Sequence, residues 1–226
     1  MNEREDYTEL IERLLRDVVI VSEDPYEPIQ VKRLPHHWTC IGAGNYAAVF
    51  QHESYPDWVV KVYGRDYEGI EKEVKVYERL GEHPAYSQLI LYGKTYLVLK
   101  RLGGITLYDA FHKGIYIPER VILDVNEALD YARARGLNPF DVHGKNVMMK
   151  DGHGYVIDVS DFYKQGIDTK WKDLVKAYYA IYIPIFSKFR IRIPYFVLDF
   201  VRHSYRTYKK WKKKMKGKSE NRSTYM

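Results

Sequence analysis

The chain has 226 residues, enough to bury a full core as one domain or as two small lobes. Its hydrophobic content of 46% and aromatic content of 15% are those of a globular protein and argue against extensive disorder. The net charge of +6 comes from the C-terminus: residues 202–226 hold ten Lys or Arg and one acid, whereas residues 1–201 hold 26 basic and 29 acidic groups. By composition, the body of the protein is therefore not a nucleic-acid-binding surface.

The N-terminal sequence and the cysteine content bear on cellular location. Residues 1–15 are charged and lack the basic, then apolar, then small-residue order of a secretory signal. The one cysteine, Cys40, cannot form an internal disulfide, which suits a reducing compartment without defining one. We expect a cytoplasmic protein, either free or peripheral to a membrane.

The first predicted element is a helix in residues 7–21. Its apolar residues are spaced for one helical face, at Leu10, Ile11, Leu14, Leu15 and Val18. A proline-containing segment, residues 24–35, follows, and we expect the helix to pack on the next element.

Two stretches rich in β-branched and aromatic residues, 38–50 and 58–63, predict strands, and Gly42 and Gly44 interrupt the first. Because glycine has no Cβ, glycines at a strand end let backbone amides approach an anion closely. The same glycines also fit an ordinary hairpin turn. Lys61 lies between valines in the second strand, where it is either a functional cation or the solvent face of an edge strand.

Residues 67–80 predict a helix with an apolar stripe of Ile70, Val74 and Tyr77. Glu73 lies beside this stripe and could reach inward to a buried lysine. Further along the chain the pattern predicts two strands in 87–99, a glycine connector at 101–104, and helices in 105–114 and 118–136.

Three oxygen-bearing side chains, Asp141, Asn146 and Asp158, follow in a polar hairpin at residues 138–161. Mg²⁺ prefers oxygen ligands and completes its shell with water and substrate phosphates, so one or two carboxylates and an amide suffice to hold Mg-nucleotide. The alternative is a polar hairpin whose Asn and Asp residues favour turns. The element order predicts an α+β arrangement of two lobes.

The order and spacing of these features resemble the protein-kinase signature: a Gly-rich loop, a strand lysine, a helix glutamate, a connector, an Asp with an Asn five residues later, and a second Asp. The resemblance runs from about residue 38 to residue 182. It implies an α+β, bilobal protein kinase-like fold with a small β-rich N-lobe and a reduced helical C-lobe, using ATP and Mg²⁺. The expected divisions are an N-terminal helix and linker (1–35), a nucleotide-binding N-lobe (36–102), a C-lobe (103–207) and a basic tail (208–226).

The N-lobe residues take their roles from this resemblance. IGAGNYAAVF resembles Gly-x-Gly-x-x-Gly-x-Val, with Gly42 and Gly44 present, Ala47 at the third glycine and Val49 beside the nucleotide. The resemblance also implies that Lys61 holds the α and β phosphates and that Glu73 is its ion-pair partner.

The connector and the polar hairpin take roles in the same way. LVLKRLGG is similar to the connector whose backbone amides bind adenine, centred on Lys100, Arg101 and Leu102. The resemblance further implies Asp141 as the base or substrate-orienting carboxylate. It implies Asn146 and Asp158 as the metal ligands.

The catalytic loop departs from typical protein kinases. Pro139-Phe140-Asp141 replaces His-Arg-Asp, so the arginine that responds to activation-loop phosphorylation is absent and no switch of that type is expected. His143 stands where protein kinases commonly have a phosphate-contacting lysine, so no role in the γ-phosphate site is assigned to it.

The metal motif and the segment after it also differ. Ile-Asp-Val-Ser, with Asp158, is similar to the corresponding motif of the Rio group of atypical kinases, and Asp158 is preferred over Asp161 because it directly ends a strand. Only fourteen residues separate Asp158 from Asp173, which leaves no room for an extended activation segment. In ordinary protein kinases that segment holds the substrate peptide.

The C-terminal third combines an aromatic-rich region with the basic tail. In residues 174–201 the longest uncharged run has eleven residues, too short to span a bilayer, so core helices are predicted, with membrane-surface contact as the alternative. The tail is either a solvated charge run or a binding segment for an anionic partner such as a membrane surface or RNA.

The leading functional hypothesis is an ATP-dependent phosphotransferase, a serine/threonine protein kinase of minimal atypical type, with Asp141 and Lys61 as catalytic residues. One alternative is a kinase of small molecules or lipid-linked sugars. Another is a pseudokinase that binds nucleotide or serves as a scaffold. Nothing in the sequence identifies the hydroxyl acceptor.

Overall fold

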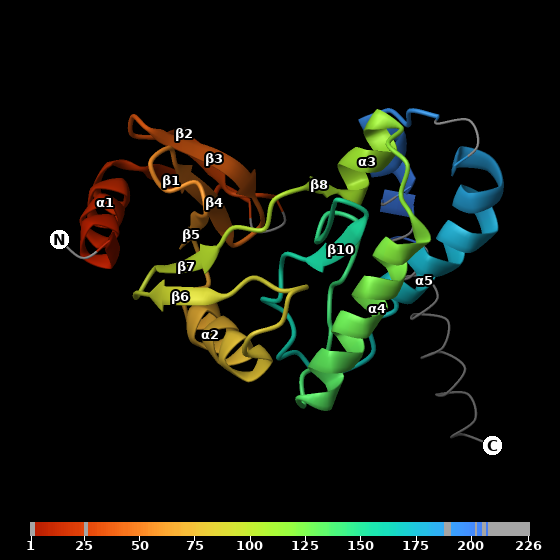
Figure 1. Cartoon of the computed structure of the whole chain (residues 1–226). Coiled ribbons are helices and arrows are strands. Elements are labelled where there is room, and N and C mark those ends of the chain that lie inside the picture. Colours follow the sequence, from red (N-terminus) through yellow and green to blue (C-terminus); the bar gives the residue numbers. More distant parts are fainter. Residues whose placement is uncertain (1–2, 25–26, 188–190, 202, 205–206, 208–226) are drawn as a thin grey trace, which may run out of the picture.

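The N-terminal half of the chain builds a sheet and the C-terminal half is largely helical, as Figure 1 shows. The structure, a computed structural model, describes residues 3–24, 27–187, 191–201, 203–204 and 207. The predicted basic tail at 208–226 lies outside the described residues. The observed order of elements confirms the predicted α+β arrangement of two lobes.

The N-lobe is a five-stranded antiparallel sheet of order β3-β4-β5-β7-β6. Its strands are β3 (Trp38–Ala43), β4 (Ala47–His52), β5 (Trp58–Tyr63), β6 (Leu89–Tyr92) and β7 (Tyr96–Lys100). Successive side chains of a strand point to opposite faces of the sheet. In β5, Val60 and Val62 accordingly enter one core, whereas Val59 and Tyr63 enter the other. Lys61 shares the second face, so it is not a solvent-facing residue of an edge strand.

The first core is closed by the N-terminal helix, α1 (Glu3–Asp17), and by the small hairpin of β1 (Val19–Val21) and β2 (Gln30–Arg33). Tyr7, Ile11 and Leu14 of α1 are fully buried against Phe50 and Val60 of the sheet. This contact confirms that the predicted helix packs on the sheet that follows it. The predicted range of 7–21 is wrong at its end, because the helix stops at Asp17 and Val19–Val21 pair with β2 as a strand. In Figure 1, α1 and α2 lie on different sides of the sheet.

The other face of the sheet carries α2 (Glu68–Leu80), which contacts β6 and β7. The predicted stripe of Ile70, Val74 and Tyr77 is buried there, as is Glu73. The helical period places residues three and four apart on the same face, so Glu73 shares the buried side with Ile70 and Tyr77. This face also meets the C-lobe, because the same core continues into its helices.

The C-lobe begins after the glycine connector with β8 (Ile105–Thr106) and α3 (Leu107–Lys113). It continues with α4 (Glu119–Ala134), β9 (Val147–Lys150) and β10 (His153–Val156), and its three strands pair in the order β10-β9-β8. Gly104 has φ +133°, and a Cβ there would lie 2.4 Å from the Met149 carbonyl oxygen. The connector therefore requires glycine where it enters the C-lobe.

The C-terminal elements are α5 (Lys170–Ala177) and a π-helix, η1 (Tyr178–Phe186), which contains Pro184. Tyr178 and Tyr182 are buried, but Ile181, Ile185 and several later apolar residues are exposed. The prediction of core helices is therefore right for one face of 174–201 and wrong for the other. Among the described residues, no helix combines the length and apolarity needed to cross a bilayer.

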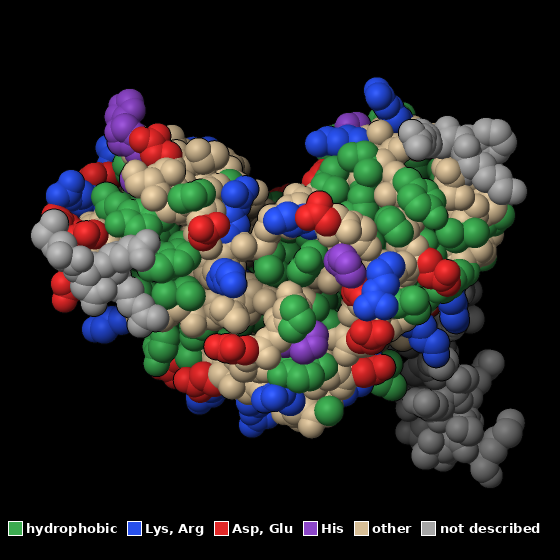
Figure 2. All heavy atoms as spheres, in the orientation of Figure 1, with side chains coloured by type: hydrophobic (Ala, Val, Ile, Leu, Met, Phe, Trp, Pro, Cys, Tyr) green, Lys and Arg blue, Asp and Glu red, His purple; other side chains and the backbone are tan. Residues whose placement is uncertain are grey.

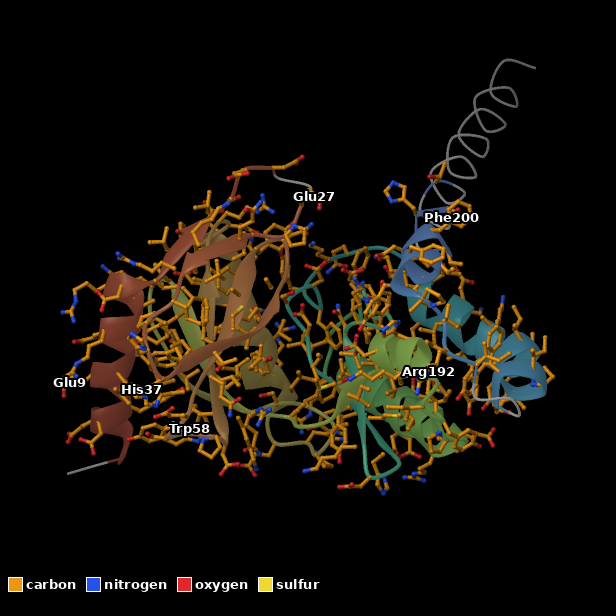
Figure 3. All side chains as sticks on the ribbon, turned by 90° about the horizontal axis from the view of Figure 1, so that it is seen from above. Glu9, Glu27, His37, Trp58, Arg192 and Phe200 are labelled. Atoms are coloured by element: carbon orange, nitrogen blue, oxygen red, sulfur yellow. The ribbon has the colours of Figure 1, made fainter. Side chains whose placement is uncertain are left out.

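The two lobes leave a hollow between them on the face drawn in Figure 2, with charged side chains along its edge. In the view from above, Trp58 lies in the N-lobe, whereas Arg192 and Phe200 lie at the far side of the C-lobe (Figure 3). The motif residues predicted from the sequence come from both lobes: Lys61 and Glu73 from the N-lobe, and Asp141, Asn146 and Asp158 from the C-lobe.

Candidate active site

Lys61, Glu73 and Asp158 meet between the lobes. The Lys61 Nζ atom lies 2.8 Å from Glu73 Oε1, 2.9 Å from Glu73 Oε2 and 3.3 Å from Asp158 Oδ1. The Lys61 side chain is 12% exposed and the Glu73 side chain 0%. Three separate elements thus converge on one ammonium group: strand β5, helix α2 and the segment after β10.

The electrostatics keep Lys61 and Asp158 ionised, whereas burial raises the pKa of Glu73 above its ordinary value. Burial alone would lower the pKa of Lys61, but the Asp158 and Glu73 carboxylates outweigh burial and hold that pKa above its ordinary value. Burial would raise the pKa of Asp158, but Lys61 and the Ser160 amide, which donates to Asp158 Oδ1 at 3.1 Å, hold it below its ordinary range. Lys61 is therefore a cation and Asp158 an anion at neutral pH.

A tyrosine completes the surroundings of the buried glutamate. The Tyr63 hydroxyl donates to Glu73 Oε2, and burial raises the pKa of Tyr63, so this tyrosine acts as a neutral donor. Tyr63 follows Lys61 by two residues in β5 and therefore lies on the same face. Glu73 is held by two donors from one strand.

The loop before β9 contains the predicted catalytic carboxylate. Asp141 has φ 61°, in the left-handed region that a non-glycine residue rarely adopts. The Asn146 side-chain amide donates to the Asp141 carbonyl oxygen at 3.1 Å, which leaves the Asn146 Oδ1 atom for another partner. The Ile157 amide donates to the Asn146 carbonyl at 3.0 Å, so Asn146 and Asp158 lie on adjoining segments.

A cation from outside the predicted motifs contacts this carboxylate. Lys170, at the start of α5, donates from Nζ to Asp141 Oδ1 and lies 3.3 Å from Asp168 Oδ2. His143, at the position of the missing lysine, has its Nε2 atom 3.8 Å from Asp141 Oδ1. Asp141 is therefore flanked by one lysine and one histidine.

The glycine-rich turn differs in detail from the expectation. The Gly44 amide donates to the Ala47 carbonyl at 2.9 Å, so it closes the β3–β4 hairpin and does not offer its N–H to an anion. A Cβ at Gly42 would meet nothing within 4 Å, which leaves open space beside this strand end. Val49 pairs directly with Lys61 across β4 and β5. Within the described part of the chain, the amides of Asn45 and Tyr46 at the tip have no backbone partner.

Arg65 fixes the back of this turn. Its guanidinium donates to the Asn45 carbonyl, to the Asp24 carbonyl at 2.7 Å and to the Glu27 carbonyl at 2.6 Å. The Tyr46 carbonyl is bound separately by the Gly64 amide at 2.8 Å. Arg65 thus ties the turn to the segment after β1 while leaving the tip amides available.

The connector offers fewer backbone groups than the sequence predicted. The Lys100 amide donates to the Gln88 carbonyl at 2.8 Å, and the Arg101 amide donates to the Asp57 carbonyl at 2.7 Å. The Ser87 hydroxyl occupies the Lys100 carbonyl at 2.5 Å. Among the described residues, the Leu102 amide has no hydrogen-bond partner. Of the predicted adenine-facing positions, Leu102 is the one whose N–H is available.

Sequence reasoning missed three residues of this site. Lys170 lies outside every motif, and Arg65 and Tyr63 have roles set by loop and strand neighbours. The signal for Tyr63 was present, because a strand residue two positions from Lys61 must share its face. For Asp161, the structure shows an ion pair with Lys164 at 2.7 Å rather than contact with Lys61.

The side chains of Asn146 and Asp158 are the candidate protein ligands for Mg²⁺. Asn146 and Asp158 supply an amide oxygen and an ionised carboxylate, which are hard oxygen ligands. Within the described residues, no three His, Cys, Asp or Glu side chains gather as a metal site made by protein alone. An amide and a carboxylate suffice for Mg²⁺ when substrate phosphates and water complete its shell, so Asn146 and Asp158 fit Mg²⁺ held together with a nucleotide.

The chain is similar to known proteins in sequence and in structure. The chain is 36% identical over 181 residues to the "Putative serine/threonine-protein kinase YrzF" of Bacillus subtilis (strain 168), covering 78% of this chain and 83% of the relative. No protein-family profile matches the chain. Among solved structures, the kinase domain of Mycobacterium tuberculosis PknI is 22% identical, with a TM-score of 0.43, covering 55% of this chain and 60% of that one.

The two lobes and the Lys61 site define a protein of the kinase-like class. The similarity to the Bacillus relative shows that the chain belongs to the protein kinase-like family. The resemblance stated from the sequence is thereby confirmed for family and fold.

Proposed function

We propose that this protein is an ATP-dependent phosphotransferase that uses Mg²⁺ and acts on serine or threonine hydroxyls of a protein. The single observation that carries the proposal is the contact of Lys61 with both Glu73 and Asp158 between the lobes. A scaffold has no physical need for a largely buried cation shared by two carboxylates from distant segments. The relative's printed name supports serine or threonine as the acceptor.

Nucleotide binding is assigned to groups on both lobes. The Leu102 amide donates to the adenine, and Val49 supplies apolar contact beside it. Lys61, fixed by Glu73, binds the α and β phosphates. The backbone amides of Asn45 and Tyr46, at the tip of the turn that contains Gly42 and Gly44, bind the phosphate groups of the nucleotide. Asn146 and Asp158 hold Mg²⁺, which when bound neutralises the negative charge of the phosphates.

Asp141 is assigned to the hydroxyl group that accepts the phosphate. Its carboxylate accepts the proton of the attacking hydroxyl and fixes the direction of that oxygen. The left-handed backbone at Asp141 is maintained by Asn146, so one residue shapes the loop and offers a metal ligand. Because such a site acts mainly by positioning and charge, loss of one group lowers the rate by about two to three orders of magnitude.

A transfer assay with Asp141→Asn tests this function. Radiolabelled ATP is incubated with the protein and with cell lysate separated into protein and small-molecule fractions. We expect label in the protein fraction for the wild type, and loss of transfer with ATP binding retained for Asp141→Asn. Label confined to the small-molecule fraction would contradict the protein acceptor, and absence of any transfer by the wild type would favour a pseudokinase.

The basic tail remains a separate proposal. Its sequence of Lys and Arg interleaved with aromatic residues supports contact with an anionic membrane surface. The exposed side chains of Phe196 and Phe200, 74% and 71% exposed, precede it in the chain and supply apolar surface of the same kind. In Figure 3, Phe200 lies on the helix at the edge of the C-lobe.

A further inference from the structure

The missing phosphate-contacting lysine of the catalytic loop leaves a physical requirement unmet. Phosphoryl transfer spreads negative charge over the oxygens of the transferred group, and a site stabilises that charge with cations and hydrogen-bond donors. In this chain the position two residues after Asp141 is His143. The contacts of His143 and of the nearby lysines indicate which residue supplies the positive charge beside the transferred phosphoryl group.

Both ring nitrogens of His143 face groups of the catalytic loop. The Lys145 amide donates to His143 Nδ1 at 3.2 Å, which requires a lone pair on that nitrogen. The proton of the neutral imidazole is then on Nε2, the atom that faces Asp141 Oδ1 at 3.8 Å. His143 is therefore placed to donate a hydrogen bond from Nε2 toward Asp141, with its other ring nitrogen engaged by the loop backbone.

The other lysines near the loop have different partners. Lys61 is shared by Glu73 and Asp158. Lys145 lies 3.9 Å from Asp199 Oδ1 and 4.1 Å from the ring centre of Tyr108, on the side of the C-terminal helix. Lys164 pairs with Asp161. Within the described residues, Lys170 is the lysine with an ion pair to Asp141.

Lys170 is anchored to the C-lobe and is not a loose surface side chain. Its amide is bonded to Asp168 Oδ1 at 2.7 Å, and its side chain is 32% exposed. The next residue, Trp171, is buried and donates from Nε1 to Asn126 Oδ1 of α4 at 2.8 Å. The start of α5 is therefore fixed on α4, which fixes the point from which Lys170 reaches the catalytic loop.

The short segment before α5 makes this reach possible. Asn138, just ahead of the catalytic loop, donates from its side-chain amide to the Lys164 carbonyl at 2.8 Å and the Gly166 carbonyl at 3.0 Å. These bonds draw the segment back against the loop. Held in this way, the short segment after Asp158 leads to the start of α5, where Lys170 contacts Asp141.

We propose that Lys170 is a catalytic residue of the phosphoryl transfer, supplying from α5 the positive charge that the catalytic loop lacks. The carboxylate that accepts the hydroxyl proton must lie beside the acceptor oxygen, and that oxygen must lie in line with the γ-phosphorus. A cation bonded to Asp141 is therefore within a side chain's reach of the γ-phosphoryl oxygens. This inference rests on the proposed function of the same site.

The covalent step is unchanged by this assignment. A bond forms between the acceptor oxygen and the γ-phosphorus, while the bond from that phosphorus to the bridging oxygen breaks and its electron pair leaves with ADP. The acceptor proton passes to the Asp141 carboxylate. Lys170 neither gains nor loses a proton, since Asp141 and Asp168 hold its pKa above the ordinary value although burial alone would lower it.

The test compares Lys170→Gln, which removes the charge but keeps a donor, with Lys170→Arg, which keeps the charge. Lys172→Gln, an exposed lysine of the same helix, is the matched control. Affinities for ATP and ADP are measured by calorimetry with Mg²⁺, beside the transfer rate and the melting temperature. We expect Lys170→Gln to bind ATP about tenfold more weakly with ADP affinity unchanged, and to transfer about 100-fold more slowly.

The outcomes are distinct. Lys170→Arg and Lys172→Gln are expected to keep most of the transfer rate. A lower melting temperature for Lys170→Gln with an unchanged ATP-to-ADP affinity ratio and rate would overturn the proposal and leave a structural ion pair. If Lys170→Gln does not fold, the affinities for ATP and ADP are measured on Lys170→Met/Asp141→Asn, which removes both charges of the ion pair. The ratio of the two affinities is then read in the same way. A wild-type protein that transfers no phosphate fails the proposed function itself, and the inference with it.

Discussion

Replacing Lys61 with methionine isolates the buried charge at the centre of the site. The substitution keeps the length of the side chain but leaves the Glu73 carboxylate, 0% exposed, with the Tyr63 hydroxyl as its remaining hydrogen-bond donor. Removing one partner of a buried ion pair is strongly destabilising, by about 3–5 kcal/mol, because the other charge stays buried without compensation. Lys61→Met should therefore lower the free energy of unfolding by about 3–5 kcal/mol near pH 8.

Glu73→Gln should cost less. The new glutamine side chain still accepts the hydrogen bond from the Tyr63 hydroxyl, and the Lys61 ammonium retains its contact with Asp158 Oδ1, 3.3 Å away. A change of about 1–2 kcal/mol is expected, the scale of one weakened charged hydrogen bond. Lys75→Met, an exposed lysine on α2, is the control and should change stability by less than about 0.5 kcal/mol.

The pH dependence gives the decisive signature of this prediction. Burial already raises the pKa of Glu73, and Lys61 opposes that rise, so removing Lys61 raises it further. A carboxyl whose pKa is higher in the folded than in the unfolded state binds more protons when folded, so stability falls as pH rises between the two values. The deficit of Lys61→Met relative to the wild type should be smaller at pH 5 than at pH 8.

Urea unfolding followed by circular dichroism at both pH values measures these free energies. A deficit that is the same at pH 5 and pH 8 would refute the claim that a stranded Glu73 carboxylate causes it. So would a larger loss for Glu73→Gln than for Lys61→Met. The double variant Lys61→Met/Glu73→Leu should recover most of the stability while losing nucleotide binding.

Two further predictions concern the connector and the tail. Gly104→Ala should lower the free energy of unfolding by about 2 kcal/mol or more, because φ at this residue is +133° and the new Cβ would meet the Met149 carbonyl oxygen. Gly103→Ala is the control and should be tolerated, because its Cβ would have no neighbour nearer than 3.8 Å. Removing residues 208–226 should leave ATP binding unchanged but abolish salt-sensitive binding to anionic vesicles in a sedimentation assay. Equal vesicle binding by the truncated chain would refute the membrane role, and binding to RNA alone would assign the tail to nucleic acid.

The sequence predicts those parts of the site that depend on the periodicity of side chains along a strand or a helix. Alternation in residues 58–63 turns Lys61 away from Val60 and Val62, and the helical stripe of 67–80 turns Glu73 inward. The spacing of Asp141, Asn146 and Asp158 makes them candidate oxygen ligands, with a turn-rich hairpin as the alternative, and their separate roles come from the resemblance to protein kinases. The structure brings Lys61, Glu73 and Asp158 together and links Asn146 to Asp141.

Features that depend on tertiary contacts could not be predicted in this way. Lys170 reaches Asp141 because Trp171 and Asn138 fix the intervening segment, and neither contact leaves a sequence pattern. The engagement of the Lys100 amide by Gln88 depends on the pairing of neighbouring segments. The exposed face of 174–201 escaped prediction because its apolar composition is also that of a buried helix.

The central claim is that Asp158 and its neighbours hold a nucleotide through Mg²⁺, and calorimetric titration with ATP tests it most directly. The wild type should bind ATP more tightly with Mg²⁺ than with EDTA, and Asp158→Asn should lose that difference while retaining its melting temperature. ATP affinity that is the same with and without Mg²⁺ in the wild type, or a Mg²⁺ effect that survives Asp158→Asn, would contradict it.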